Sequence, residues 1–343
     1  MNKRNNHKRY ALLTPSIGVS KGGIQTWSYY IVKLLEHCNM NISYSSLLEM
    51  KGKGILKMLY FNVSANTYIL TIWHMFFFVI FAYILSLLHI KNYSFYILFH
   101  GGEILKLNKL QRMFLKLILR SKNMHTIANS NATSNLLNKV LNIYADKVIH
   151  PFIEINIKNK QKRKIVDYHF LTLTRLVKRK NISNVLKAIK ILKEESGLKF
   201  HYCIAGRGDE YRNLVRLAKR LHIEDSITFL GIVNEEQKKC LYTWADLFIL
   251  PSKELKHSIE GYGIVFIEAN SFGVPVISGN TGGMKEAVID GITGLHCNGT
   301  VNDIVEKISM AIKTSFDTEQ IHKHAEKHDY RNQLDFINFI KGD

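Results

Sequence analysis

Short apolar runs alternate with longer amphipathic stretches along most of the chain. Apolar runs bounded by glycine, proline or polar residues predict strands, and apolar positions three and four residues apart predict helices. The predicted strands are 10–14, 93–99, 124–128, 146–150, 170–174, 200–205, 226–230, 246–250 and 275–278. The predicted helices are 26–36, 107–119, 131–141, 183–193, 210–221, 235–244, one around Glu268, one from about Met284, and polar helices from Asn302 onward. This alternation predicts an α/β protein with parallel sheets.

The order strand, loop, helix begins twice, at residue 10 and again at residue 170. Between these two halves lies a basic and polar run, residues 158–164, which we interpret as a linker. A chain of 343 residues is long enough for two α/β domains, each with its own core. We therefore predict an N-terminal domain over 1–157, a C-terminal domain over 165–325, and a separate C-terminal helix over 326–343.

Residues 68–88 form the most apolar segment, close to the roughly 20 residues of a membrane-spanning helix. However, Thr71, His74 and Ser86 fall loosely on one helical stripe, and a span would separate the two halves of the chain. We expect a helix that lies partly in the core and partly on a bilayer surface, with a true span as the alternative. The basic segment 1–9 is not followed by a signal-peptide pattern.

The chain carries 47 lysines and arginines against 28 acidic residues, a formal net charge of +19. Such an excess favours polyanionic partners: nucleic acid, anionic lipid or phosphorylated substrates. The four cysteines are far apart and form no C-x-x-C pair. This spacing argues against structural zinc or a disulfide framework and fits a reducing cytosol.

Two carboxylates, Glu260 and Glu268, bracket a Gly-x-Gly turn and the start of an apolar helix. We expect Glu260 in the loop and Glu268 inside the helix. The amides of Gly263 and Ile264 would then lie at a helix N-terminus, where a phosphate can bind. Alternatively, the two acids are a helix N-terminal charge and a solvated helix residue.

Arg175 and Lys180 follow the first strand of the second half, where a doubly wound sheet presents its loops to a ligand. Arginine binds phosphate oxygens in a bidentate way and lysine acts as a point charge, so the pair could clamp a diphosphate. Because Lys178 and Arg179 lie beside them, a solvated basic loop is the alternative.

The first half offers two weaker candidates, each just after a predicted strand. Gly22 and Gly23 precede a helix, as in phosphate-binding loops, although a plain turn is the alternative. His100 ends the strand 93–99 at the sheet edge where ligands bind, although an incidental histidine in a capped turn is the alternative.

Further motifs complete the pattern: Gly206-Arg-Gly208, Phe229-Leu-Gly231, Pro251-Ser252 and Gly282-Gly283. Together these residues resemble the retaining nucleotide-sugar glycosyltransferases of family 4. The resemblance is continuous over residues 200–295, whereas in the first half it covers only 22–24, 100–101 and 128–130. It implies a GT-B fold: two facing Rossmann-like domains with a cleft between them, and a C-terminal helix that packs back on the N-terminal domain. Asn181 replaces a usual glycine, and we expect it to adopt a left-handed backbone.

The resemblance also implies roles for the residues of the donor site. Glu268 would bind the ribose hydroxyls of the donor. Arg175 and Lys180 would hold its diphosphate and stabilise the leaving charge. Residues around Gly206 and Gly231 would line the nucleobase pocket.

The transferred sugar would be held by Glu260 together with the amides of Gly263 and Ile264. Gly23 would allow the first loop to approach the phosphate and sugar closely, and His100 would contact the sugar. On this resemblance the departing phosphate takes the acceptor's proton, so retention needs no carboxylate nucleophile, and Glu260 positions the sugar.

No Asp-x-Asp motif occurs, and the resemblance implies a metal-independent hexosyltransferase without a cofactor, whose nucleotide-sugar donor is a co-substrate. We expect a glycan or lipid-linked glycan acceptor in lipopolysaccharide, O-antigen or other surface-polysaccharide synthesis. The protein would be cytoplasmic and peripheral on the anionic inner face of the cytoplasmic membrane, with no nucleic-acid partner. Two alternatives remain: a nucleic-acid-binding protein, although no such motif appears, and a sugar-nucleotide epimerase on the same fold.

Overall fold

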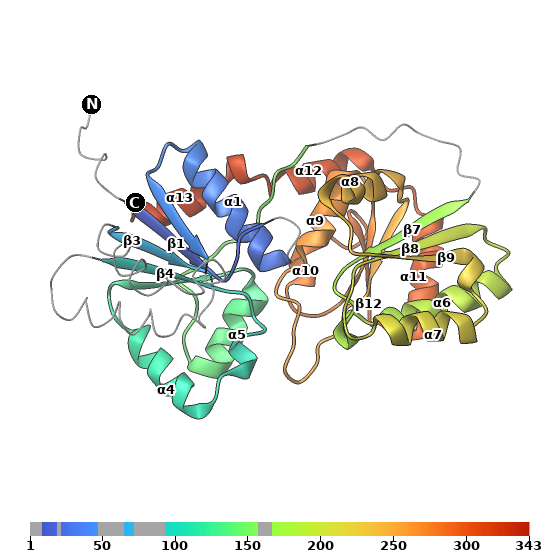
Figure 1. The fold of residues 1–343 in the computed structure, drawn as a ribbon, viewed down its shortest axis with the longest axis horizontal. Helices are drawn as coiled ribbons and strands as arrows, with labels where there is room; N and C mark the ends of the chain where they lie inside the picture. The colour runs from blue at the N-terminus through green and yellow to red at the C-terminus, as the bar shows by residue number, and fades with distance from the viewer. Residues whose placement is uncertain (1–8, 19–21, 47–64, 72–92, 157–166, 343) are drawn as a thin grey trace. The chain divides into compact units, whose positions relative to one another are not determined.

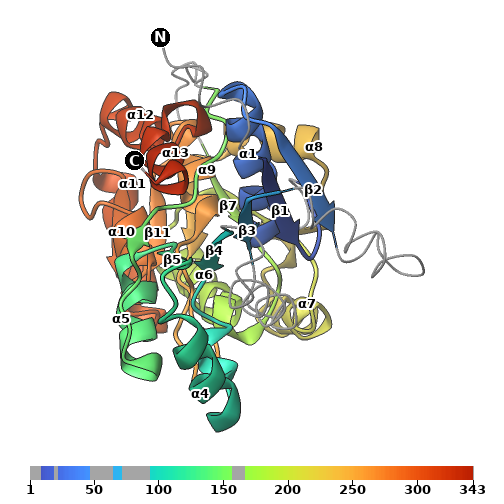
Figure 2. The same ribbon diagram turned by 90° about the vertical axis from the view of Figure 1, so that its left-hand side faces the viewer.

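The computed structural model describes residues 9–18, 22–46, 65–71, 93–156 and 167–342. The chain forms two compact units (Figures 1 and 2). Unit 1 consists of Met1–Glu154 and Asp329–Asp343, and unit 2 consists of Ile155–His328. The predicted linker, residues 158–164, lies outside the described residues.

Unit 1 contains a six-stranded sheet in the order β2-β1-β3-β4-β5-β6, in which every neighbouring pair is parallel. Its strands are β1 (Tyr10–Thr14), β2 (Ile42–Ser46), β3 (Thr67–Leu70), β4 (Ser94–Phe99), β5 (Met124–Ala128) and β6 (Lys147–Val148). Its helices are α1 (Gly23–His37), α4 (Lys109–Ile118), α5 (Asn131–Leu141) and α13 (Leu334–Lys341), with the short 3₁₀ helices η2 (Ile104–Lys106) and η5 (Tyr330–Asn332). The central strands β3 and β4 are mostly apolar and buried, as expected for a parallel sheet whose two faces are covered.

The C-terminal segment packs on the core of unit 1, which confirms the prediction that it returns to the N-terminal domain. The Tyr96 hydroxyl on β4 donates to the carbonyl of Phe339 at 3.1 Å. Phe339 lies on α13, and on the same helix the ring of Phe336 packs against that of Phe152, with 5.8 Å between the ring centroids. The chain re-enters unit 1 at Asp329 and not at residue 326.

Unit 2 contains a second six-stranded parallel sheet, in the order β12-β11-β10-β7-β8-β9. Its strands are β7 (Tyr168–Leu173), β8 (Phe200–Ala205), β9 (Ile227–Gly231), β10 (Leu247–Leu250), β11 (Val276–Gly279) and β12 (Gly294–Cys297). Its α-helices are α6 (Ile182–Glu195), α7 (Tyr211–Arg220), α8 (Glu235–Trp244), α9 (Ile264–Ser271), α10 (Met284–Ala287), α11 (Val301–Lys313) and α12 (Thr318–Glu326), joined by the 3₁₀ helices η3 (Lys178–Lys180) and η4 (Glu224–Ser226). This strand order is that of the Rossmann fold, and the order reverses between β7 and β10.

Three strands differ from the sequence-based predictions. The predicted helix over 68–88 is wrong at its start, because Thr67–Leu70 is β3, paired between β1 and β4. Periodicity alone does not separate a short apolar strand from a buried helix. The remainder, 72–88, lies outside the described residues. β2 and β12 were not predicted, since Ile42–Ser46 is mostly polar and Gly294–Cys297 is only four residues long.

Within the described residues, no helix combines the length and the apolar character needed to cross a bilayer.

Candidate active site

The loops after β7 and β10 adjoin because these two strands are neighbours at the switch point of the unit 2 sheet. The amide of Lys253, after β10, donates to the carbonyl of Arg179, after β7, at 2.8 Å. Loops at the carboxyl ends of such strands form ligand sites in open α/β sheets. The topology therefore brings Lys180 and Glu260 together from positions eighty residues apart.

Glu260 is held by two cations at this point. Its Oε2 atom accepts from Lys180 Nζ and from Arg179 Nη1, each at 2.5 Å. The Glu260 side chain is 14% exposed, and those of Arg179 and Lys180 are 11% and 9% exposed. This burial contradicts a solvated loop for the two cations. It also excludes a simple solvent-exposed N-terminal charge for Glu260.

The cluster carries one more positive than negative charge, and the pKa directions follow from that excess. Burial opposes the ionisation of Glu260, but the charges of Lys180 and Arg179 outweigh it and lower the pKa of Glu260 to about 2. Burial also lowers the pKa of Lys180, which Glu260 offsets only in part because Arg179 and Arg175 repel the ammonium charge. An anion would complete the charge balance.

Arg175 differs from Lys180 in its surroundings. Its side chain is exposed, and it has no ion pair with any residue that the structure describes. Its charge nonetheless reaches Lys180, whose pKa it helps to lower. The sequence paired Arg175 with Lys180, whereas the side chain that shares Glu260 with Lys180 is Arg179.

Glu268 lies on α9 and is only 8% exposed, which contradicts a solvated helix position. Its Oε1 atom accepts from Lys238 Nζ at 2.9 Å and its Oε2 atom from the Tyr242 hydroxyl at 2.9 Å. Both donors lie on α8, four residues apart and hence on one helix face. Lys238 also pairs with Glu235 at 2.9 Å.

Lys238 and Tyr242 were not predicted as site residues, although their spacing of four on a predicted helix was a usable signal. Burial disfavours the charge on Lys238, but Glu268 and Glu235 outweigh burial and raise its pKa. Burial, followed by the charge of Glu268, raises the pKa of Tyr242 far above its usual range. Both groups therefore remain donors to Glu268 at neutral pH.

Helix α9 begins at Ile264, with Gly263 as its N-cap residue in a left-handed conformation (φ 97°). The amides of a helix's first turn have no partner within the helix and attract anions. The loop after β11 packs against the residues just before this terminus, where the amide of Gly283 donates to the carbonyl of Glu260 at 3.2 Å. A Cβ atom on Gly283 would lie 1.9 Å from the carbonyl oxygen of Gly261, so only glycine fits this approach.

Gly206 and Gly231 lie together at the ends of β8 and β9, where the amide of Gly206 donates to the carbonyl of Gly231 at 2.6 Å. With φ at +133°, Gly206 presses on the loop after β7, and a Cβ atom there would lie 1.8 Å from the carbonyl oxygen of Thr174. Asn181 has the left-handed backbone that the sequence predicted (φ 60°), and its side chain donates to the carbonyl of Gly299 at 2.8 Å.

His100 and Gly23 lie in unit 1, whereas the other predicted residues lie in unit 2. Gly23 is exposed and begins α1. His100 Nε2 lies 2.8 Å from the carbonyl of Thr71, which can only accept, so Nε2 carries the hydrogen. Burial lowers the pKa of His100, which leaves the ring neutral at pH 7 with Nδ1 as a hydrogen-bond acceptor.

Three buried polar atoms on the loops after β7, β10 and β11 have no hydrogen-bond partner within the described part of the chain: Arg179 Nε, Ser252 Oγ and Thr281 Oγ1. Buried polar groups in native proteins are nearly always paired. Among the described residues, no group of three or more histidine, cysteine or acidic side chains is arranged to hold a metal ion.

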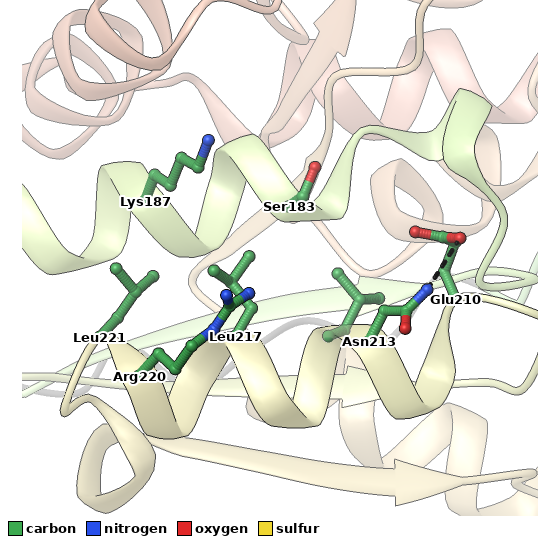
Figure 3. Close-up of a pocket in the computed structure, with 8 residues that line it drawn as sticks. Ser183, Lys187, Glu210, Asn213, Leu217, Arg220 and Leu221 are labelled. Carbon is green, nitrogen blue, oxygen red and sulfur yellow. Dashed lines mark hydrogen bonds between the residues drawn. The ribbon is translucent and has the colours of Figure 1, made fainter.

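A separate open groove of about 530 Å³ lies between α6 and α7 (Figure 3). It is lined by Ser183, Lys187, Glu210, Asn213, Leu214, Leu217, Arg220 and Leu221. At one end of the groove, Asn213 on α7 donates to Glu210, the residue before this helix, at 3.3 Å. None of the predicted site residues lines this groove, so it is distinct from the candidate site.

The family model described as "Glycosyl transferases group 1" matches residues 154–328, just over half of the chain. The chain belongs to this family. The matched segment contains the whole of unit 2, and with it both carboxylates and the cations that hold them.

Similar curated proteins within this family match a shorter part of the chain. A GDP-mannose-dependent alpha-(1-6)-phosphatidylinositol monomannoside mannosyltransferase of Mycolicibacterium smegmatis is 33% identical over 138 residues, 39% of this chain and 35% of the relative. An N-acetyl-alpha-D-glucosaminyl L-malate synthase of Bacillus anthracis is 32% identical over 145 residues, 42% of this chain and 35% of the relative. The alignments thus span about a third of these relatives' lengths.

Solved structures with the same fold cover nearly the whole chain. Anabaena HepE in complex with UDP and glucose has a TM-score of 0.70 at 17% identity, covering 98% of this chain and 100% of that one. The lipopolysaccharide outer core galactosyltransferase WaaB has a TM-score of 0.72 at 15% identity, covering 97% of this chain and 99% of that one. The predicted fold class, two Rossmann-like domains of the GT-B type, is confirmed.

Proposed function

We propose that the protein is a retaining, metal-independent glycosyltransferase that moves a hexose-type sugar from a nucleotide diphosphate sugar to a glycan acceptor. The observation that supports this most strongly is the buried cluster of Glu260, Arg179 and Lys180 at the switch point of unit 2. Within it, Glu260 comes from the β10–α9 connection and the two cations come from the loop after β7, whereas Glu268 lies on α9 itself.

The excess positive charge of this cluster fits the donor's diphosphate. Lys180 has three ammonium hydrogens and gives only one to Glu260, so it can also donate to a phosphate oxygen. Arg175 is exposed near the cluster and can bind the outer phosphate oxygens. These fixed charges would stabilise the leaving diphosphate without a metal ion.

Glu260 is suited to positioning and not to base catalysis. A carboxylate with a pKa of about 2, held by two cations, is a weak base at neutral pH. In the proposed step the bond from the sugar's anomeric carbon to the phosphate oxygen breaks, and the acceptor oxygen forms its bond on the same face. The acceptor's proton passes to the departing phosphate, so the anomeric configuration is retained.

Glu268 is proposed to bind the ribose hydroxyls. Each of its oxygens accepts one hydrogen bond, from Lys238 or from Tyr242, and each keeps a second lone pair. Nearby, Gly206 and Gly231 would line the nucleobase pocket. In unit 1, the Nδ1 acceptor of His100 would receive a sugar hydroxyl, and Gly23 would allow close approach of the α1 loop.

The acceptor is proposed to be a glycan or lipid-linked glycan in the synthesis of lipopolysaccharide, O-antigen or another surface polysaccharide. Two proteins similar to this chain are named for transfer to a phosphatidylinositol mannoside and in the lipopolysaccharide outer core. The net charge of +19 supports a peripheral location on the anionic inner face of the cytoplasmic membrane.

The decisive test is a panel of UDP-, GDP- and dTDP-sugars measured by thermal stabilisation and then by transfer. A donor at 100 times its Kd should add about 2.7 kcal/mol to stability. Transfer should give a product with the donor's anomeric configuration, and EDTA should not reduce the rate. Stabilisation by none of the donors, or an inverted product, would contradict the proposal.

Neither alternative gains support from a specific feature of the site. A salt-dependent shift of DNA without sugar-nucleotide binding would favour a nucleic-acid-binding protein. Epimerisation of the donor in the absence of any acceptor would favour an epimerase.

A further inference from the structure

Helix α4 of unit 1 exposes an apolar stripe that the fold does not require. The stripe, defined as Leu110, Met113 and Leu117, has side chains that are 60%, 61% and 57% exposed. Met113 and Leu117 follow Leu110 by three and seven positions, so the three residues share one side of the helix. A different side of α4 already covers the core through Leu115 and Ile118.

The surroundings of this stripe are strongly and uniformly basic. From Ile104 to Ala145 the sequence contains seven lysines and arginines and no acidic residue. Three of the cations, Lys109, Lys116 and Arg120, repeat along α4 and just beyond it at spacings of seven and four. They have no ion pair with any residue in the described ranges.

The geometry of α4 divides its surface into three sectors. Successive residues of a helix are rotated by about 100°. On this geometry Leu115 and Ile118 lie on one side of the apolar stripe, and the three cations lie on its other side. Its N-terminus is fixed by a capping box, in which Asn108 and Gln111 exchange side-chain to backbone hydrogen bonds at 2.8 and 3.0 Å. The helix packs beside α5 at the edge of unit 1 (Figures 1 and 2).

An anionic bilayer fits this surface better than other polyanions or a protein. Interfacial helices place an apolar stripe at the level of the acyl chains and flanking cations among the lipid headgroups. A nucleic-acid backbone would use the cations but not the exposed leucines. A protein interface is depleted of lysine at its core, whereas here lysines flank the stripe.

We propose that α4 docks unit 1 on an anionic membrane surface, with the stripe of Leu110, Met113 and Leu117 inserted and Lys109, Lys116 and Arg120 among the headgroups. The proposal deepens the membrane location given under the proposed function and does not depend on donor binding. It assigns the contact to a described helix and not to the apolar run 72–88.

The test is flotation of the full chain with vesicles of equal parts phosphatidylglycerol and phosphatidylcholine, against phosphatidylcholine alone. Two triple variants are compared with the unaltered protein: Leu110→Gln/Met113→Gln/Leu117→Gln and Lys109→Gln/Lys116→Gln/Arg120→Gln. Each cation near such a surface contributes about a fivefold factor in binding, so the charge variant should bind roughly 100-fold more weakly. The apolar variant should bind at least about tenfold more weakly at every salt concentration.

Matched controls come from elsewhere in the chain. Arg212→Gln/Arg216→Gln/Lys219→Gln removes the same charge from α7, none of whose residues is an exposed large hydrophobic. Ile292→Gln/Met310→Gln/Leu334→Gln removes three apolar side chains that are 40%, 42% and 61% exposed. Both controls should bind vesicles as the unaltered protein does, apart from a loss of less than about tenfold from net charge.

Several results would overturn the proposal. One is failure of the unaltered protein to float with anionic vesicles, and another is an equal loss of binding in the α7 charge variant and the α4 charge variant. Retained binding in both α4 variants, with loss on polar substitution of Phe76, Phe77 and Phe78, would assign the contact to the apolar run. Self-association that the stripe variant abolishes, without vesicle binding, would make α4 a protein interface. Thermal stabilisation by sugar nucleotides, measured on every variant, reports separately on the proposed function.

Discussion

Each carboxylate of the candidate site is held by two donors, and all four donors come from other elements of unit 2. Glu260 is bound by Arg179 and Lys180, and Glu268 by Lys238 and Tyr242. The two sets differ in charge. The first has a surplus cation, which suits a diphosphate, whereas the second has a single cation that Glu235 also shares. This difference in charge fits the proposed roles of Lys180 and Glu260 at the diphosphate and sugar, and of Glu268 at the ribose hydroxyls.

Replacing Glu268 by glutamine should weaken donor binding by about 1.5–3 kcal/mol, roughly 10- to 150-fold, because an ionised acceptor is lost. The amide has the same shape, so the fold should persist. Calorimetric titration with the donor found in the panel measures the effect. The control is Glu235→Gln, which loosens the same Lys238 without touching the proposed ribose position. Equal losses in both variants would refute a direct contact.

Lys180 should make donor binding sensitive to alkaline pH. Its pKa in the folded protein is lowered from 10.5, chiefly by burial, so it loses its positive charge at a lower pH than an ordinary lysine. Affinity for the nucleoside diphosphate of the donor found in the panel should therefore fall by about tenfold or more as pH rises toward 10.5. Lys180→Arg keeps its charge throughout, and the nucleotide titrates identically with both proteins. Parallel pH profiles for the two proteins would contradict the assignment.

At the scale of elements, the site depends on loops that approach each other too closely for side chains. The loop after β11 rests on the loop after β10, with Gly282 and Gly283 against the backbone of Glu260 and Gly261. On the other side, α8 presents its two donors from a helix fixed by a capping box of Asn234 and Gln237. Backbone packing and helix register thus set the positions of the two carboxylates.

Gly282→Ala tests this dependence against a matched position. Gly282 and Gly197 have similar left-handed backbones (φ +59° and +61°), and alanine there costs about 1–2 kcal/mol of folding free energy. Only at Gly282 would the new Cβ atom meet a neighbour, the carbonyl oxygen of Glu260 at 2.6 Å. Urea unfolding should show destabilisation of both variants, whereas donor affinity should fall only in Gly282→Ala. An unchanged affinity there would show that the loop contact does not position Glu260.

At the scale of the whole molecule, the chain leaves unit 1, builds unit 2, and returns to unit 1 at Asp329. The returning segment completes the core of unit 1, since Phe336, Ile337 and Ile340 are all buried. Unit 1 therefore contains parts from both ends of the described chain. Its stability depends on residues that lie far from it in sequence.

Phe336→Ala should lower the free energy of unfolding of unit 1 by about 3–5 kcal/mol, because the ring is fully buried against Phe152. On the same helix, Leu334 is 61% exposed, and Leu334→Ala should change stability by less than about 0.5 kcal/mol. Urea unfolding of the two variants, compared with the unaltered chain, measures the difference. Similar values for the two would mean that the C-terminal helix does not stabilise unit 1.

Most helices and strands could be predicted from the sequence because the signals for them are local. The strand 124–128 and the helices 131–141 and 235–244 coincide with β5, α5 and α8, and the two helices begin after the capping residues Ser130 and Asn234. Glycines also indicated the site loops. A positive φ or a close backbone approach requires glycine in such loops, and this requirement is visible in the sequence. Six predicted site residues lie on the loops and helix of one switch point: Arg175, Lys180, Glu260, Gly263, Ile264 and Glu268.

Partners and pairings were not available from the sequence in this way. In the sequence, Arg179 and Lys238 look like ordinary surface cations. In the folded chain each binds a carboxylate that is thirty or more residues away. Likewise, Thr67–Leu70 is a strand because β1 and β4 lie on either side of it. The exposed face of α4 is also known only from what the fold leaves uncovered.

The sequence by itself determined the α/β class, the parallel sheets and the positions of the two acids, because periodicity and backbone freedom are properties of short segments. Only the tertiary structure decided which cations hold those acids and that Thr67–Leu70 pairs as a strand between β1 and β4. The reason is that contacts between distant segments depend on strand order, and strand order is fixed by the burial of the whole chain.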